Sequence, residues 1–231
     1  MDFASFTSGS TVAAIGALGT ASFGIVDGLK TLPVIGISNS GYAFLQRGMQ
    51  EFFPAERRRT AKGDLKILFD TLHGNWINGR ELNDQKAIAK SLIKLRLNAD
   101  TATQFAKATG VDAVALAKVG TKMSNNTPFE EAETNVLGRF DLALSAILDD
   151  AYQHADQRYR NWAKLTASFV AILLALLGGS TLVKPGVAYL CTNDMWLALL
   201  AGVLAAPLAP MTKDIASALQ AGVKAAQAFR S

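Results

Sequence analysis

The sequence is poor in the residues on which many enzymes and metal sites depend. Among 231 residues there is one cysteine, Cys191, and there are two histidines, His73 and His154. A single cysteine excludes an intrachain disulfide and a thiolate metal cluster within one chain. The sequence contains no Walker loop, dinucleotide-binding fingerprint or nucleophile elbow. We therefore expect no enzyme, no cofactor and no catalytic or metal site.

Both histidines have an aspartate at helical spacing, and this is the one arrangement with the character of a metal site. Asp70 precedes His73 by three residues, and Asp150 precedes His154 by four. The two pairs would form a site only if the fold brought them together. Such spacings are frequent in any helix, so exposed residues of mixed charge are the preferred interpretation. A membrane enzyme that uses these pairs is the least favoured of three hypotheses about the function.

Charge is also scarce, and long stretches have none. Only 18% of the residues are charged, 50% are apolar and the mean hydropathy is +0.20, whereas an ordinary soluble domain has about 25% charged residues. Residues 165–183 carry no charge, and a second uncharged run covers residues 195–212. Two such runs separated by a short polar bend predict a helical hairpin in a membrane.

A third uncharged stretch, residues 3–26, lies near the N-terminus. It is long enough to span a bilayer, but it is rich in small residues and poor in leucine, which predicts weak insertion. A signal peptide is disfavoured because no basic residue precedes the stretch. We expect this segment either to form a first transmembrane helix or to lie on the membrane surface.

The charged residues around these runs predict one orientation. The hairpin is flanked by basic residues at both ends, and these are Arg158, Arg160, Lys164 and Lys213. The N-terminal stretch has basic residues only after it. Because basic loops are retained on the cytoplasmic side, the N-terminus is expected outside, and the middle domain and the C-terminus in the cytoplasm.

The residues between the membrane segments, 46–127, are typical of a block of short helices. Apolar residues at helical spacing predict one helix over residues 65–76 and another over residues 84–95, with Leu95 on its apolar side. The expected N-caps of the next two helices are Asp100 or Thr101, and Asp112.

Basic residues gather at two places in this block. One is the arginine triplet at residues 57–59, and the other is a row at helical spacing formed by Lys86, Lys90 and Lys94. Both groups are able to contact phosphates. A solvated cytoplasmic surface near anionic lipid explains them equally well, and the net charge of +4 follows from the bias for basic residues inside. Nucleic acid is therefore not a favoured partner.

A long helix is predicted over residues 128–183. It should begin at Thr127-Pro128-Phe129-Glu130, which combines an N-cap, a proline at the first helical position and a capping-box glutamate. Apolar residues then form one stripe that continues into the uncharged run, namely Phe129, Ala132, Val136, Phe140, Leu144, Ile147, Ala151, Ala155, Tyr159 and Trp162. The short helices are expected to cover this stripe in a packed domain.

Small residues in the N-terminal stretch predict a close helix contact. They recur every fourth residue, at Gly16, Thr20, Gly24 and Gly28. The third span has a similar side, formed by Ala198, Ala201, Gly202 and Ala205. The partner of each is either a second copy of the chain or another helix of the same chain, and contact between copies is the slightly favoured alternative.

Asp27 is the ionisable residue beside this first ridge. A carboxylate near membrane depth is costly unless it is paired or hydrated, so it marks an ion path, a proton site or the position of a partner charge. Lys30 follows three residues later, and a local pair at the inner boundary is the preferred interpretation.

Together these features predict an all-α integral membrane protein with about three transmembrane helices, a cytoplasmic helical domain and one long helix continuous from the cytoplasm into the membrane. Its expected segments are residues 1–45, 46–127, 128–183, 184–212 and 213–231, the last an amphipathic helix. The favoured function is a homo-oligomeric pore, channel or membrane-bound structural ring, whose partners are membrane lipid and further copies of itself. The alternative is a non-conducting anchor or adaptor that recruits a cytoplasmic protein.

Overall fold

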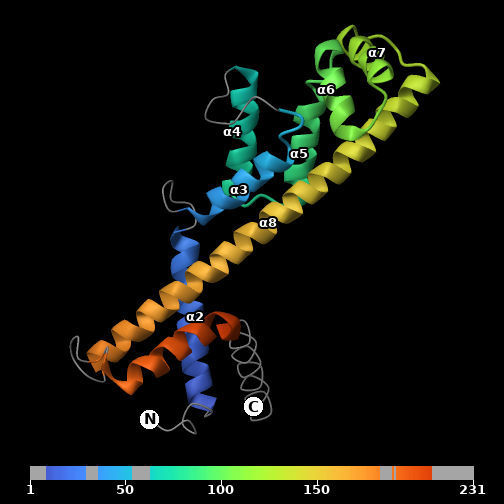
Figure 1. Cartoon of the computed structure of the whole chain (residues 1–231). Coiled ribbons are helices and arrows are strands. Elements are labelled where there is room, and N and C mark those ends of the chain that lie inside the picture. The colour runs from blue at the N-terminus through green and yellow to red at the C-terminus, as the bar shows by residue number, and fades with distance from the viewer. Residues whose placement is uncertain (1–8, 30–35, 54–62, 183–188, 190, 210–231) are drawn as a thin grey trace, which may run out of the picture. The chain divides into compact units, whose positions relative to one another are not determined.

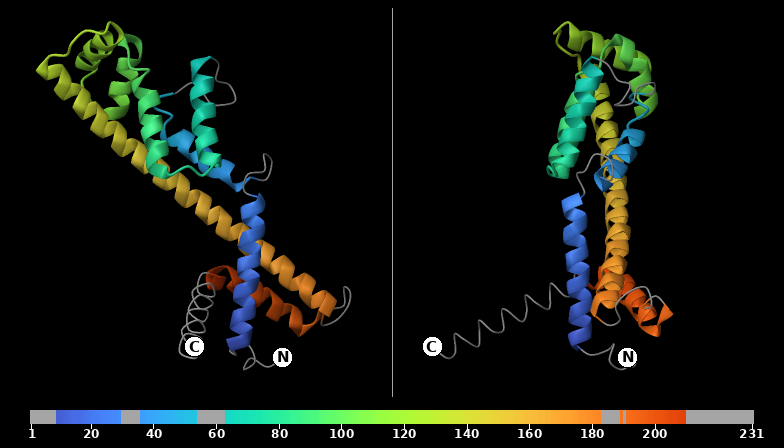
Figure 2. Two further views of the ribbon diagram at one scale, coloured as in Figure 1. Left: turned by 180° about the vertical axis from the view of Figure 1, so that it is seen from behind. Right: turned by 90° about the vertical axis from the view of Figure 1, so that its left-hand side faces the viewer.

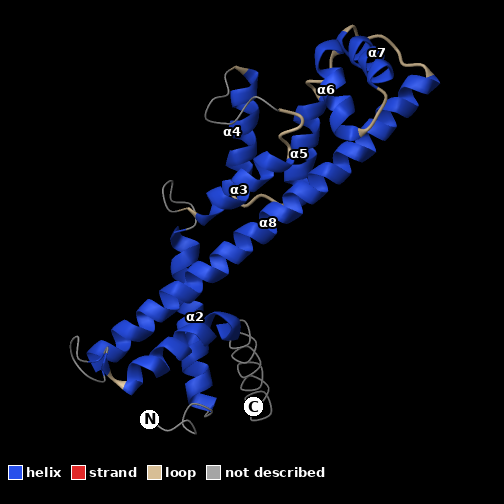
Figure 3. Ribbon diagram, viewed as in Figure 1, coloured by secondary structure: helices blue, strands red, loops and turns tan. Residues whose placement is uncertain are grey.

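The computed structural model describes residues 9–29, 36–53, 63–182, 189 and 191–209. Within these residues every regular element is a helix and none is a strand (Figure 3), which confirms the predicted all-α class. The chain divides into two compact units. Residues 36–159 form the helical unit, and residues 1–35 and 160–231 form the apolar unit. The predicted segment 213–231 lies outside the described residues.

The described residues of the helical unit form five helices and the first part of a sixth (Figure 1). They are α3 (Ile37–Gly48), α4 (Asp64–Ile77), α5 (Leu82–Lys94), α6 (Ala99–Thr109), α7 (Ala113–Ser124) and α8 (Glu131–Leu182). The predicted helices over 65–76 and 84–95 correspond to α4 and α5. The latter ends one residue before Leu95, which is 80% exposed rather than on the apolar side as predicted.

Two of the predicted helix starts can be compared directly with the observed caps. Asp112 caps α7 as expected, because its carboxylate oxygen accepts a hydrogen bond from the backbone N–H of Ala115 at 2.7 Å. The cap of α6 is Asn98 rather than Asp100 or Thr101. Its side-chain oxygen accepts hydrogen bonds from the backbone N–H groups of both residues, at 3.0 and 2.9 Å. Asn98 therefore satisfies two of the N–H groups that a helix start leaves without partners.

Helix α8 runs without interruption over 52 residues, from Glu131 to Leu182. Its start was predicted three residues too early, at Pro128. The Glu133 carboxylate accepts a hydrogen bond from the backbone N–H of Glu130 at 2.8 Å, and Lys122 at the end of α7 donates to the same carboxylate at 2.6 Å. Glu133 therefore caps the helix from within its own first turn, and Lys122 fixes that carboxylate.

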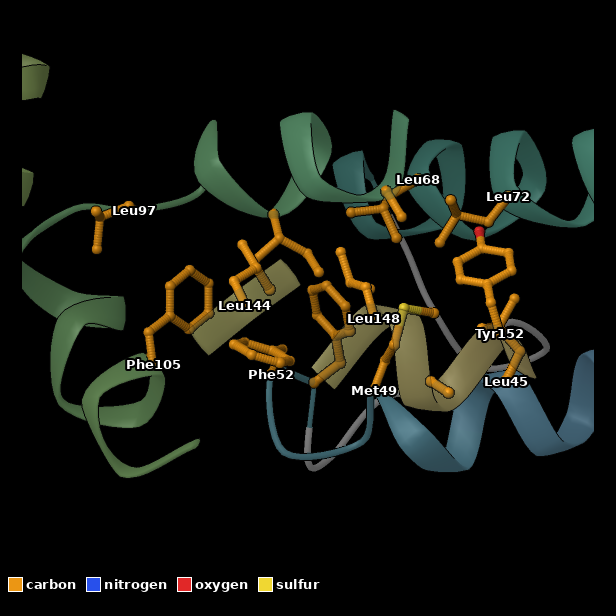
Figure 4. Packing of buried hydrophobic residues seen from close by; sticks show 14 of the residues in the cluster. Leu45, Met49, Phe52, Leu68, Leu72, Leu97, Phe105, Leu144, Leu148 and Tyr152 are labelled. Atoms are coloured by element: carbon orange, nitrogen blue, oxygen red, sulfur yellow. The ribbon is translucent and has the colours of Figure 1, made fainter. Parts of the chain in front are cut away.

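The core of the helical unit forms along one side of α8 (Figure 4). The middle of the predicted stripe is correct, because Phe140, Leu144, Ala151 and Ala155 are buried. Its ends are not buried, since Phe129 is 37% exposed and Trp162 is 43% exposed. Every short helix contributes to this core, with Leu45 from α3 and Met49 directly after it, Leu68 and Leu72 from α4, Ile93 from α5, Phe105 from α6, and Leu116 and Val119 from α7.

Two buried polar side chains of this core donate hydrogen bonds to other segments. The Tyr42 hydroxyl donates to the carbonyl of Phe69 at 2.8 Å, which joins α3 to α4. The Trp76 indole donates to the carbonyl of Ser38 at 2.8 Å, which joins the same two helices a second time. Because an unmade buried hydrogen bond is costly, these bonds fix how α4 packs on α3.

The described helices of the apolar unit are α2 (Gly9–Leu29), the second part of α8 and a helix over Asn193–Ala209, named here the 193–209 helix (Figure 2). Ile15, Ala171 and Ala205 are buried together where the three meet. Close backbone contact depends on glycine. A Cβ atom added to Gly19 would lie 2.0 Å from the carbonyl oxygen of Ala205, and one added to Gly202 would lie 2.6 Å from the Cα of Ile172.

The segment between α8 and the 193–209 helix is described at Tyr189, Cys191 and Thr192. Tyr189 is buried, and its hydroxyl donates to the backbone carbonyl of Asp194 at 3.0 Å. Cys191 is a free thiol and is exposed.

Two helices are long and apolar enough to cross a membrane, judged by length and composition. They are the segment Thr11–Leu29 and the apolar part of α8. The 193–209 helix is apolar too, but its described part is shorter. Large apolar side chains are exposed on α8 at Leu165, Phe169 and Leu177. Such a surface is what a protein in contact with lipid presents, because hydrocarbon is as apolar as these side chains.

Candidate interaction surfaces

Helix α2 has two different faces. The face directed into the apolar unit carries Ile15, Gly19, Ser22 and Val26, all of them buried. The predicted ridge lies only partly on this face, because Gly16 is buried whereas Thr20, Gly24 and Gly28 are exposed. A Cβ atom added at Gly24 or at Gly28 would meet no heavy atom within 4 Å. Most of the ridge is therefore uncovered in the described part of this chain.

Two glycines of the apolar unit, Gly19 and Gly202, lie against the backbone of another helix. Gly202 belongs to the small-residue side predicted for the third span, so the structure uses part of that side within one chain. Gly19 was not among the predicted contact residues. Its signal in the sequence was its spacing from the apolar residues Ile15 and Val26, which places the three on one side of a helix.

Two hydroxyl groups of α2 donate hydrogen bonds within their own helix. Thr20 donates to the carbonyl of Gly16 at 3.0 Å, and Ser22 donates to the carbonyl of Leu18 at 2.8 Å. Asp27 is exposed and makes a contact in the structure. Lys30 lies outside the described residues, so its predicted pairing with Asp27 stays a prediction.

The lysine row on α5 contacts a polar row on α8. Lys86 donates to a carboxylate oxygen of Asp149 at 2.7 Å, and Lys94 donates to Asp141 at 2.9 Å. Lys90 lies between them and donates to both Asp141, at 2.5 Å, and the hydroxyl of Ser145, at 3.0 Å. Residues spaced by four positions on one helix thus meet residues spaced by four positions on the other.

These contacts between the lysine row of α5 and the polar row of α8 are called the ladder below. They give the lysine row a structural role in place of contact with phosphates. Burial acts to raise the pKa of the Asp141 carboxyl, but the hydrogen bonds from Lys90 and Lys94 outweigh it and hold that pKa below its ordinary value of 3.8. A similar arrangement is found at the start of α8, where the hydrogen bond from Lys122 lowers the pKa of Glu133 below 4.5.

The two Asp–His pairs do not form a shared metal site among the described residues. Nε2 of His73 lies 3.1 Å from the amide oxygen of Asn39, and Asp70 accepts a hydrogen bond from Lys66 at 2.6 Å. His154 lies 3.3 Å from Asp150 on exposed helix surface. In the described part of the chain no group of three or more His, Cys, Asp or Glu side chains is placed to hold a metal ion.

The described part of the helical unit has open grooves on its surface, and two of them have a volume above 500 Å³. The larger, of about 680 Å³, lies between the end of α3 and α6, and its lining includes Gln50, Glu51, Asp100, Gln104 and Lys107. The other, of about 530 Å³, lies beside α5 and is lined by Ala87, Lys90, Ser91, Lys94, Leu95 and Met123. The second groove is notable for Leu95, whose apolar side chain is exposed within it.

No protein-family model matches the chain, and no curated protein or solved structure is significantly similar to it.

Proposed function

We propose that this chain is an integral membrane protein whose copies assemble through α2 into a pore, channel or membrane-bound structural ring. The helical unit forms the cytoplasmic part of this assembly, and the proposed role involves no catalysis. The observation that carries the proposal is the uncovered small-residue face of α2 at Thr20, Gly24 and Gly28. Small residues allow two helices in a membrane to approach closely.

The burial pattern of α2 supports a contact between copies over a contact within one chain. The face with Gly19 is already occupied by the 193–209 helix of the same chain. The face with Gly24 and Gly28 has no such neighbour among the described residues. A second helix can therefore approach the glycine face without displacing the contacts that hold the apolar unit together.

The proposed topology places the N-terminus outside and the helical unit and C-terminus in the cytoplasm. It rests on the basic residues at the hairpin boundaries, of which Arg160 and Lys164 are exposed on α8. Basic residues that flank an apolar helix are retained on the cytoplasmic side.

The assembly is tested with a double variant, Gly24→Leu with Gly28→Leu, purified in mild detergent. Light scattering should give a multiple of 24.5 kDa for the wild-type protein and a single-chain mass for the variant. Helical content should not change, because a Cβ atom at either position has no neighbour within 4 Å. Ala14→Leu adds similar bulk at an exposed position of the same helix and should leave the mass unchanged.

A wild-type protein that is already monomeric, or a double variant that keeps the oligomeric mass, overturns this proposal. Conductance across planar bilayers then separates the two forms of assembly. A current that disappears in the double variant indicates a pore or channel, and an oligomer without current indicates a structural ring.

The alternative, a membrane anchor or adaptor that recruits a cytoplasmic protein, is favoured by the groove beside α5. Leu95 is 80% exposed there, and Met123 and Lys94 line the same groove. If this groove binds a partner, a second protein should co-purify in a fixed ratio and be lost on Leu95→Glu. Ile67→Glu changes an exposed apolar residue of α4 outside this groove and is the matched control.

A further inference from the structure

The apolar part of α8 is polarised across its width. Ala167 and Ala171 are fully buried, and Ala171 packs with Ile15 and Ala205 in the interior of the apolar unit. Leu165, Phe169 and Leu177 are each at least 60% exposed, and Leu173 is also exposed. At 100° per residue, Leu165, Phe169 and Leu173 lie on the side of the helix opposite the two alanines. Small residues therefore point inward and large ones outward, the reverse of a helix packed against a soluble core.

This outward face requires an apolar environment. Burial of one large apolar side chain is favourable by about 1.5–3 kcal/mol. A row of such side chains in water would lose this free energy at every position. From residue 165 to the end of α8 at Leu182 the helix rises about 27 Å, close to the hydrocarbon thickness of about 30 Å. The acyl chains of a bilayer fit this face in both chemistry and length.

The exposed apolar row ends sharply at a basic and aromatic turn. Arg160, Trp162 and Lys164 are exposed in the five residues that precede Leu165. Arg160 and Lys164 are four positions apart and share one side of α8, whereas Trp162 lies on the side of Phe169. No acidic residue occurs between Asp156 and Asp194. The turn therefore has a positive charge on one side and an indole on the other.

We propose that residues 160–164 form a collar around α8 that binds the headgroups of anionic phospholipids. Arg160 and Lys164 donate hydrogen bonds to phosphate oxygens, and the Trp162 indole lies at the level of the headgroups, where amphipathic rings are favoured. Leu165 then marks the first residue in the hydrocarbon. The collar rests on the proposed membrane embedding and adds the class of lipid and the residue at which the boundary lies.

The test measures lipid selectivity of the full chain. The protein is reconstituted with vesicles of phosphatidylcholine alone and of phosphatidylcholine mixed with phosphatidylglycerol, and the lipids retained after gentle solubilisation are counted by native mass spectrometry. The wild-type protein should retain phosphatidylglycerol in preference to phosphatidylcholine. Each basic residue near an anionic surface contributes about fivefold in affinity, so Arg160→Gln with Lys164→Gln should reduce the preference about twenty-five-fold.

Two further variants test whether a lost lipid preference results from the lost charges or from damage to the fold. Arg160→Lys with Lys164→Arg keeps both charges and should keep the preference. Lys107→Gln with Lys118→Gln removes two exposed lysines of the helical unit and should also keep it. Equal selectivity in the wild-type protein and the glutamine variant overturns the collar.

Flotation on density gradients distinguishes failure of the collar from failure of the proposed function. A wild-type chain that floats with both kinds of vesicle but shows no lipid preference is a membrane protein without the collar. A wild-type chain that floats with neither kind overturns the membrane proposal and the collar together.

Discussion

Nζ of Lys90 lies 2.5 Å from a carboxylate oxygen of Asp141, and this contact joins α5 to α8 across 51 positions in the sequence. Lys94 occupies the other oxygen of the same carboxylate at 2.9 Å. One acidic side chain thus pairs with two basic ones, and all three are about one-third exposed or less. Partial shielding from water makes such a network more stabilising than an isolated surface pair.

Replacement of Asp141 by Asn should destabilise the helical unit, because Lys90 and Lys94 would lose their shared counter-charge. We expect a loss of about 1 kcal/mol in the free energy of unfolding, measured by urea titration in detergent with circular dichroism at 222 nm. Asp84→Asn is the matched control, since its pair with Arg80 is half exposed on both sides. Equal losses for the two substitutions would show that the ladder contributes no more to the free energy of unfolding than an exposed ion pair does.

The same carboxylate gives a dependence of stability on pH. The folded-state pKa of Asp141 is below its ordinary value of 3.8, so the folded protein binds fewer protons than the unfolded chain at a pH near that value. Its stabilising contribution is therefore present above pH 3.8 and is lost as the pH falls through the lower, folded-state pKa. Thermal midpoints measured between pH 5 and pH 2.5 should fall less steeply for Asp141→Asn than for the wild-type protein.

Gly41 provides a test of packing inside the helical unit. A Cβ atom at this position of α3 would lie 2.5 Å from Cζ2 of Trp76 and 3.0 Å from the carbonyl oxygen of Ala155. Gly41→Ala should therefore destabilise by about 1–3 kcal/mol. Gly138→Ala, on exposed α8 surface without a neighbour within 4 Å, should instead stabilise by up to about 1 kcal/mol because alanine favours helix.

The two faces of α2 make opposite predictions for small substitutions. Gly19→Ala places a methyl group 2.0 Å from the carbonyl oxygen of Ala205, so it should lower the thermal midpoint of the purified protein in detergent. Gly24→Ala meets no neighbour in the described chain and should leave that midpoint unchanged or raise it. If Gly19→Ala were tolerated as well as Gly24→Ala, the close contact between α2 and the 193–209 helix would be refuted.

Local features of the sequence predicted those elements that are determined locally. Asp112 caps α7 because its side chain reaches an N–H group three residues away. The cap of α6 was assigned to the wrong residue because Asn98, Asp100 and Thr101 are all good cap formers. Only the path of the chain after α5 decides that Asn98 is the one outside the helix.

Contacts between distant segments were beyond local patterns. The spacing of Lys86, Lys90 and Lys94 predicted that they share a side of a helix, but nothing in it indicated which residues lie opposite. Their partners are 47 to 63 positions away. The same holds for the burial of Leu148 and Tyr152 on α8, which depends on where the short helices are placed against it.

The small-residue ridge on α2 shows a different limit of prediction from the sequence. A repeat of four residues advances 400°, so each step drifts by about 40° around the helix. Gly16 and Gly28 are three steps apart and therefore differ by about 120°. Gly16 is buried while Gly28 is exposed, whereas Ile15, Gly19, Ser22 and Val26 alternate steps of four and three and remain on one face.

The exposed position of Cys191 gives the protein a built-in reporter of sidedness. It is the single thiol in the sequence, so a membrane-impermeant maleimide dye reacts at one defined point and no residue needs to be engineered. Added to sealed right-side-out vesicles, the dye should label the proposed hairpin bend without permeabilisation, and Cys191→Ser supplies the blank. One labelling reaction on the native chain thereby establishes which compartment faces the bend between α8 and the 193–209 helix.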